Sequence, residues 1–305
     1  MSLRDRALGA AYGVGWSGVK LLPDLPSERL FRAGADLAYG RQGKGARRLR
    51  SNLSRVVAAT PALRGADVDA LAAKAMRSYA RYWREVFRLP VTPTERIVGD
   101  MQVADEHLLR DAYAGGRGVI LALPHMGNWD HAGAWLVSTG VPFTTVAERL
   151  EPASLFERFV AFRESLGMEV VPLTGGEQPP FVLLRERLEA GRMLCLLADR
   201  DLTPAGVPVE FFGSTATMPA GPALLAVRTG AVLLPVTLWY DDPAPWSARI
   251  HEPVRDPGSG SEAERVATMT QQMADAFASA IAAHPADWHM LQRLWRDDLD
   301  PARRA

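Results

Sequence analysis

One histidine and one nearby aspartate have the residue types and spacing for acid–base chemistry. His125 and Asp130 lie in the segment Pro-His-Met-Gly-Asn-Trp-Asp, directly after an apolar run. A histidine near neutral pH can take a proton from an alcohol while the alcohol oxygen attacks a carbonyl. A carboxylate on the other ring nitrogen fixes the tautomer and stabilises the imidazolium that forms. The pair therefore predicts a general base and its orienting partner.

The local sequence predicts a turn that brings these two side chains together. Pro124 ends a strand, Gly127 permits a tight bend, and Asn128 is a favourable N-cap for a helix. Asp130 then falls in the first helical turn, where the helix dipole favours its charge. We expect Asp130 to reach back to His125.

A second histidine with the same spacing lacks this context. His251 and Asp256 are separated by a segment without glycine, and Pro253 favours extended backbone there. In an extended chain, residues five apart are separated by roughly 16 Å and point to opposite faces. We interpret His251 as an ordinary histidine at a strand end.

Other chemistries find little support in the sequence. It contains no Gly-x-Ser-x-Gly elbow of a serine hydrolase and no phosphate-binding loop. The glycines at Gly43–Gly45 do not follow a strand, so they are no dinucleotide-binding motif. The single cysteine, Cys195, lies in an apolar strand-like run, where a thiol is usually inert. His284 and His289 lack partners at zinc spacing, so no metal site is expected. Because the sequence shows no nucleophilic residue, we expect a group to pass directly from one bound substrate to the other within a ternary complex.

The elements that must position these residues form an α/β pattern. Residues 1–97 read as mostly helical, and from about residue 98 short apolar runs alternate with helical segments. The predicted strands are residues 118–123, 143–147, 169–173, 193–198 and 232–240, with helices at 135–138, 154–166, 180–190, 222–228 and 262–283 and an edge strand at 248–252. This alternation predicts a mainly parallel central sheet with helices on both faces and an N-terminal helical segment. We treat residues 1–305 as one domain, with a helical part at 1–97 and a catalytic core at 98–300.

In such open sheets the site lies beyond the carboxyl ends of the strands. Two of these ends carry polar residues, at Pro124–Asp130 and at Asp199–Asp201.

The overall composition limits the kinds of molecule that the protein is expected to bind. The 305 residues include 35 basic and 35 acidic residues, so no overall basic field favours nucleic acid. The longest apolar stretch near the N-terminus, residues 8–16, is far shorter than the roughly 20 residues of a spanning helix. We expect a cytoplasmic protein without transmembrane helices.

Several ordered motifs resemble one known family. His125–Asp130 after an apolar strand resembles the bacterial lipid A biosynthesis acyltransferases, within the wider lysophospholipid acyltransferase-like superfamily. The similarity extends through residues 98–296, in Arg163 with Gly167, Asp199–Asp201, Phe211–Gly213, Thr217, Gly221–Ala223, Thr229–Ala231, and Pro285 with Trp288.

The resemblance implies an acyl-CoA or acyl carrier donor, a hydroxylated glycolipid acceptor, no metal or other cofactor, and attachment to the inner membrane. The N-terminus departs from the lipid A enzymes because it lacks their usual spanning segment. The whole chain is similar to the mycobacterial members that act on phosphatidylinositol mannosides. That similarity implies transfer of an acyl group, with palmitoyl-CoA as donor, to a mannose hydroxyl on the cytoplasmic face of the membrane.

The resemblance also implies roles for particular residues. His125 is the base and Asp130 its orienter, while Asp199 assists the base or holds a sugar hydroxyl. A separate set, Glu148, Arg163 and Arg200, either binds a donor or acceptor phosphate or forms ion pairs within itself. Residues 221–227 either line an acyl channel or belong to the core.

Two alternatives remain open at this stage. The acceptor could be another lipid, such as a glycerolipid or a lipid A-like molecule. The chain could also be a lipid-binding protein that keeps the fold without catalysis, although the intact His125 and Asp130 argue against this.

A basic segment near the N-terminus is a candidate membrane contact. Six cations fall within fifteen residues, interleaved with apolar residues: Arg41, Lys44, Arg47, Arg48, Arg50 and Arg55, with Leu49, Leu53, Val56 and Val57. A basic amphipathic helix can lie on anionic lipid, and a solvated helix face is the equally weighted alternative.

Overall fold

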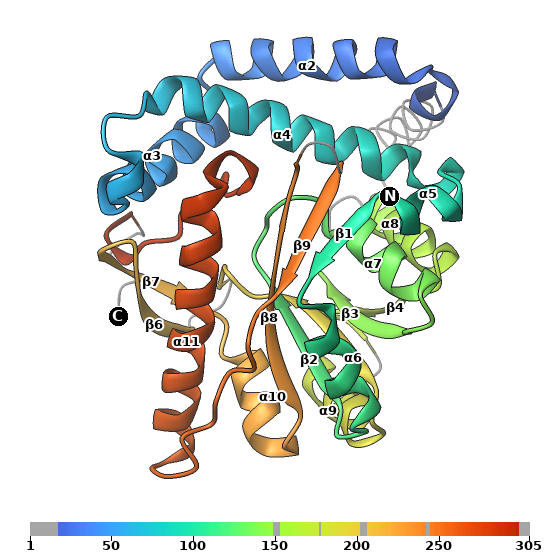
Figure 1. The fold of residues 1–305 in the computed structure, drawn as a ribbon, viewed down its shortest axis with the longest axis vertical. Helices are drawn as coiled ribbons and strands as arrows, with labels where there is room; N and C mark the ends of the chain where they lie inside the picture. The colour runs from blue at the N-terminus through green and yellow to red at the C-terminus, as the bar shows by residue number, and fades with distance from the viewer. Residues whose placement is uncertain (1–17, 149–152, 177, 202–205, 242–244, 299–305) are drawn as a thin grey trace.

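A seven-stranded sheet forms the centre of the molecule (Figure 1). The computed structural model describes residues 18–148, 153–176, 178–201, 206–241 and 245–298. The strand order is β1-β9-β8-β2-β5-β3-β4. These strands are β1 (Met101–Ala104), β2 (Val119–Leu123), β3 (Phe143–Ala147), β4 (Glu169–Pro172), β5 (Met193–Leu197), β8 (Val232–Trp239) and β9 (Trp246–Ile250).

The sheet is mainly parallel, as the sequence predicts. The pair β8–β9 is antiparallel, while the other neighbouring pairs are parallel. The expectation of an edge strand at residues 248–252 is wrong, because β9 lies between β8 and β1 and the short strand β1 forms the edge. The short connection from β8 to β9 permits only antiparallel pairing, and β1 then adds to the free side of β9.

Helices cover both faces of the sheet, as predicted. One face carries α6 (Glu106–Ala114), α7 (Trp129–Ser138) and α8 (Ala153–Ser165), and the other carries α9 (Pro180–Glu189), α10 (Gly221–Thr229) and α11 (Glu262–Ala283). The side chains of β2 alternate between these two cores: Leu121 packs with the first group, and Ile120 packs with the second. A separate hairpin, β6 (Val207–Phe211) and β7 (Ser214–Met218), packs beside α11.

The N-terminal helices lie over one end of the sheet. They are α2 (Asp24–Gly40), α3 (Lys44–Ala59), α4 (Val68–Arg88) and α5 (Thr94–Gly99). Helix α4 runs across the end at which β2 and β8 finish, and α2 lies on its outer side (Figure 1).

The apolar side of α3 faces the protein rather than solvent. Leu49, Leu53 and Val56 have no exposed surface and belong to the core. Of the two alternatives for this helix, an apolar membrane-facing surface made by these residues is therefore wrong, because the core already covers them. Among its basic side chains, Lys44, Arg47 and Arg50 are exposed, whereas Arg48 is half-buried and Arg55 lies over the ring of Trp295.

Within the described residues, no helix combines the length and hydropathy needed to cross a bilayer. The apolar stretch at residues 8–16 lies outside the described residues.

Candidate active site

His125 and Asp199 meet at the carboxyl ends of two paired strands. His125 follows β2 and Asp199 follows β5, and these strands run parallel side by side. His125 Nδ1 lies 2.6 Å from Asp199 Oδ1. The other carboxylate oxygen accepts the backbone N–H of His125 at 3.0 Å and the indole N–H of Trp288 at 2.9 Å. Asp199 is fully buried and has three donors.

These contacts favour the ionised form of Asp199 and select the tautomer of His125. Burial alone would raise the pKa of Asp199, but the charge and hydrogen bonds of His125 and the hydrogen bond from Trp288 hold that pKa below its ordinary value. An ionised carboxylate only accepts hydrogen bonds, so Nδ1 of His125 carries the proton. The lone pair of Nε2 is then available to act as a base.

Asp130 has different partners from those predicted. Its carboxylate accepts Arg163 Nε at 2.7 Å, Arg163 Nη2 at 3.2 Å and the hydroxyl of Tyr82 at 2.7 Å. The prediction that Asp130 orients His125 through Nδ1 is therefore wrong. Asp199 already occupies that nitrogen, and Asp130 joins α7 to α4 and α8.

The turn between His125 and Asp130 nevertheless forms as predicted. Gly127 has a φ of +59°, and a Cβ there would lie 2.8 Å from the backbone of Leu238. The side chain of Asn128 accepts the backbone N–H of His131 and caps α7. Its amide also donates to the buried carboxylate of Glu85 on α4. The turn is thus fixed from two sides, and it holds His125 at the end of β2.

A C-terminal segment closes over the pair. The backbone N–H of His289 donates to the carbonyl of His125 at 2.7 Å, and that of Gly127 donates to the carbonyl of Asp287 at 2.9 Å. Ser78 on α4 lies 2.9 Å from His289 Nε2 and donates to Asp287. Burial lowers the pKa of His289 to about 3, so its ring stays neutral.

Sequence reasoning did not assign a chemical role to Trp288, Tyr82 or Trp129. Trp288 entered only as part of a family motif. Trp129 lies between His125 and Tyr82, with ring centroids 5.6 Å and 4.0 Å away. Its buried indole N–H has no hydrogen-bond partner among the described residues.

The three predicted substrate-binding residues separate into two places. Arg200 Nη2 lies 3.4 Å from Glu148 Oε2, so these two form the ion pair that was one of the open alternatives. Arg163 instead binds Asp130, and this partner raises its pKa against the effect of burial. Arg200 keeps a buried Nε without a hydrogen-bond partner among the described residues.

His251 and Cys195, which the sequence indicated to be structural residues, have structural surroundings. His251 Nε2 lies 2.9 Å from the hydroxyl of Thr237, whereas Asp256 pairs with Arg265. Burial raises the pKa of the Cys195 thiol far above its ordinary value. No group of three or more potential metal ligands occurs within the described parts of the chain.

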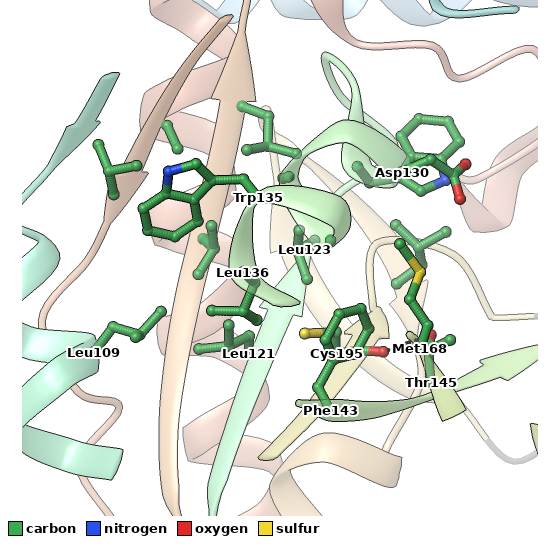
Figure 2. A pocket seen from close by; sticks show the side chains of 18 of the residues that line it. Leu109, Leu121, Leu123, Asp130, Trp135, Leu136, Phe143, Thr145, Met168 and Cys195 are labelled. Carbon is green, nitrogen blue, oxygen red and sulfur yellow. Dashed lines mark hydrogen bonds between the residues drawn. The ribbon is translucent and has the colours of Figure 1, made fainter. Parts of the chain in front are cut away.

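An apolar cavity lies between α7 and the sheet (Figure 2), and its lining includes Trp129, whose ring centroid is 5.6 Å from that of His125. Trp129, Asp130 and Arg163 belong to its lining, and most of the remaining lining side chains are aliphatic or aromatic. Figure 2 shows Leu109 on the side away from Asp130. The helix at residues 221–229 does not line this cavity, and Ala223 and Leu225 are core residues.

A histidine base held by a buried carboxylate beside an apolar cavity is suited to acyl transfer. The chain belongs to the bacterial lipid A biosynthesis acyltransferase family, whose model matches residues 4–297.

Among curated proteins, the chain is 51% identical to the phosphatidylinositol mannoside acyltransferase of Mycolicibacterium smegmatis, over 96% of this chain and 93% of that protein. It is 49% identical to the phosphatidylinositol mannoside acyltransferase of Mycobacterium tuberculosis, over 100% of this chain and 93% of that protein.

Proposed function

We propose that the protein transfers a palmitoyl group from acyl-CoA to a mannose hydroxyl of a phosphatidylinositol mannoside at the cytoplasmic face of the cell membrane. The observation that carries this proposal is the His125–Asp199 pair, which leaves Nε2 free as a base. The names of the two relatives support the acceptor.

The proposed reaction proceeds in one ternary complex. Nε2 of His125 takes the proton of the mannose hydroxyl as the oxygen attacks the thioester carbonyl. The imidazolium is stabilised by the charge of Asp199. The carbon–sulfur bond then breaks, and the proton passes from His125 to the departing thiolate to give free CoA and the new ester. No residue of the chain becomes acylated, and the transfer uses no metal or other cofactor.

The apolar cavity is the proposed site of the acyl chain. Its lining is almost entirely aliphatic and aromatic, and Asp130 and Trp129 place one side of it near His125. Its volume is about 80 Å³, too small for a whole palmitoyl chain, so the lining leucine and methionine side chains must move apart on binding. Filling the far side with Leu109→Phe should slow transfer from palmitoyl-CoA more than transfer from octanoyl-CoA. Equal slowing of both donors would argue against this site.

The ion pair of Arg200 and Glu148 is the proposed contact for the polar part of a substrate. Glu148 is 54% exposed, and Nε of Arg200, which has no hydrogen-bond partner in the described part of the chain, can donate a hydrogen bond when a substrate reaches it. Arg163 acts instead by holding Asp130.

The outer face of α2 is the proposed contact with the membrane. Leu25, Leu30 and Leu37 are 67%, 58% and 56% exposed, and Leu21 just before the helix is 85% exposed. Leu30 and Leu37 are two helical turns apart and share one face. Arg29 and Arg32 are exposed on the same helix, but so are Asp24, Glu28 and Asp36, so the proposed contact depends on the exposed leucines rather than on a basic excess.

A product assay tests the proposal and its alternatives. Purified protein and palmitoyl-CoA are incubated with a phosphatidylinositol mannoside, with a lysoglycerophospholipid, or with a lipid A precursor. We expect thiol release and a product heavier by one palmitoyl group with the mannoside alone. A product on another acceptor would reassign the substrate. An absence of thiol release with all three would favour the non-catalytic lipid-binding protein.

A further inference from the structure

A second pocket lies away from the histidine–aspartate pair, between α3 and the C-terminal segment at residues 293–298. Four of its seven lining residues are cationic: it is lined by Lys44, Arg47, Arg48, Ser51, Asn52, Arg293 and Asp298. Its volume, about 580 Å³, falls within the range typical of small-ligand sites.

The positive charge of this pocket is largely uncompensated. Its one carboxylate, Asp298, is 2.9 Å from Arg55 and thus already paired. Lys44, Arg48 and Arg293 have no acidic partner within the described ranges of the chain. The whole sequence has a formal net charge of zero, so this excess is local rather than a general property of the surface.

The pocket is also held in shape. Asn52 is buried, and its amide donates to the carbonyls of Met290 at 2.8 Å and Gln292 at 2.9 Å. These bonds fix the C-terminal segment, and with it Arg293, against α3. Helix α3 begins at Lys44 without a side-chain cap, so the positive end of its dipole lies at the same pocket.

We propose that this pocket binds a phosphate ester. Several cations on two chain segments, a helix N-terminus and the hydroxyl of Ser51 together match a phosphate group. The favoured source is the phosphate of an anionic lipid headgroup, because α3 follows directly on α2, whose outer face carries the exposed leucines (Figure 1). A free phosphate ester has the same chemistry and is the other source. The inference does not depend on the proposed transfer reaction.

The test uses the full-length protein and two matched double variants. The pocket variant is Arg48→Gln with Arg293→Gln. The control is Arg117→Gln with Arg192→Gln, which removes the same charge from exposed positions before β2 and β5, at the other end of the sheet. Binding of inorganic phosphate and of glycerophosphoinositol is measured by calorimetry. Flotation is measured with vesicles of phosphatidylcholine alone and of phosphatidylcholine mixed with phosphatidylinositol. Melting temperatures check folding.

We expect wild type and control to bind glycerophosphoinositol, and the pocket variant to lose this binding. Preference for phosphatidylinositol vesicles should fall by about fivefold for each cation removed. If the pocket variant loses the soluble anions but floats like wild type, the pocket takes a free phosphate ester. If neither anion binds wild type, or both bind the pocket variant equally well, the proposal is wrong.

Discussion

Asp130 and Asp199 are both buried close to the same short turn, but of these two only Asp199 contacts His125. Replacing Asp199 by Asn places an amide on Nδ1 and favours the wrong tautomer. We expect kcat to fall by about 10³–10⁴-fold with little change in KM, measured as thiol release from palmitoyl-CoA.

Asp130→Asn provides the comparison, because it leaves the buried Arg163 without its carboxylate. Loss of one partner of a buried ion pair lowers the free energy of unfolding by about 3–5 kcal/mol. Unlike Asp199→Asn, this variant should therefore show a lower melting temperature. A fully stable Asp130→Asn protein with no activity would contradict this division of roles.

Trp288 should act through Asp199 rather than on the substrate. Trp288→Phe keeps an aromatic ring but removes the indole N–H, and a hydrogen bond to a charged group contributes about 1.5–3 kcal/mol. We expect kcat to fall about 10- to 100-fold with KM nearly unchanged. Without that donor the pKa of Asp199 rises, so the acidic limb of the pH–rate profile should move to higher pH. A variant with a wild-type profile would show that Trp288 only fills space.

Two buried histidines should make folding sensitive to acid. Burial lowers the pKa of His289 from 6.5 to about 3 and that of His131 from 6.5 to about 4. Both are neutral in the folded state, so stability is lost as pH falls below the unfolded value, where only the unfolded chain takes up protons.

From about pH 6.5 to about pH 5, each histidine should cost about 2 kcal/mol of the free energy of unfolding. The measurement is denaturant unfolding at several pH values, with His289→Gln as the comparison. We expect a shallower pH dependence in this variant, and an unchanged slope would contradict the assignment.

At the scale of residues, the turn was predictable from sequence, but the orienting contact of His125 was assigned to Asp130, while Asp199 was given only as a residue that assists the base or holds a sugar hydroxyl. Proline, glycine and the asparagine cap are local signals, and they specify where β2 ends and α7 begins. The choice between Asp130 and Asp199 depends on which side chain the folded sheet places at Nδ1. Asp199 is 74 residues away from His125, so spacing along the chain could not decide it.

At the scale of elements, the turn after β2 depends on one glycine. Gly127→Ala would add both left-handed backbone strain and a clash with the backbone of Leu238. Gly140→Ala is a matched control, because it has a φ of +87° but no atom within 4 Å of the added Cβ. We expect the control to lose about 1–2 kcal/mol of stability and to keep its activity. Gly127→Ala should lose more stability and most activity, and equal behaviour of the two would refute a special role for this turn.

The strands and helices of the core were largely predictable, because each buried strand is a short apolar run between helical segments. The edge of the sheet was not. Strand β1 has only four residues, which is too short for a clear sequence pattern. Strand β9 pairs on both sides because of how the chain connects β8 to β9 and β1, and its own sequence does not show this. The hairpin β6–β7 was also missed, since Phe211–Gly213 was interpreted as a family motif rather than as a turn. There Phe212 has a positive φ of 51°, which its residue type does not predict.

At the scale of the whole molecule, the outer face of α2 should determine membrane attachment. Leu30→Gln with Leu37→Gln removes two exposed apolar side chains without touching the core. At about 1 kcal/mol for each leucine, vesicle binding should weaken by more than tenfold. Leu173→Gln is the control, since this leucine is 39% exposed and lies after β4. Similar flotation of all three proteins would remove α2 from this role.

The most direct test of the central claim is the rate of palmitoyl transfer by His125→Ala with a phosphatidylinositol mannoside and palmitoyl-CoA, both saturating. His125 is partly exposed at the site, so the variant should melt close to wild type. With no base to take the hydroxyl proton, we expect transfer to fall by at least about 10³-fold, in both thiol release and the mass spectrum of the lipid product. A folded His125→Ala protein that kept a tenth of the wild-type rate would contradict the account.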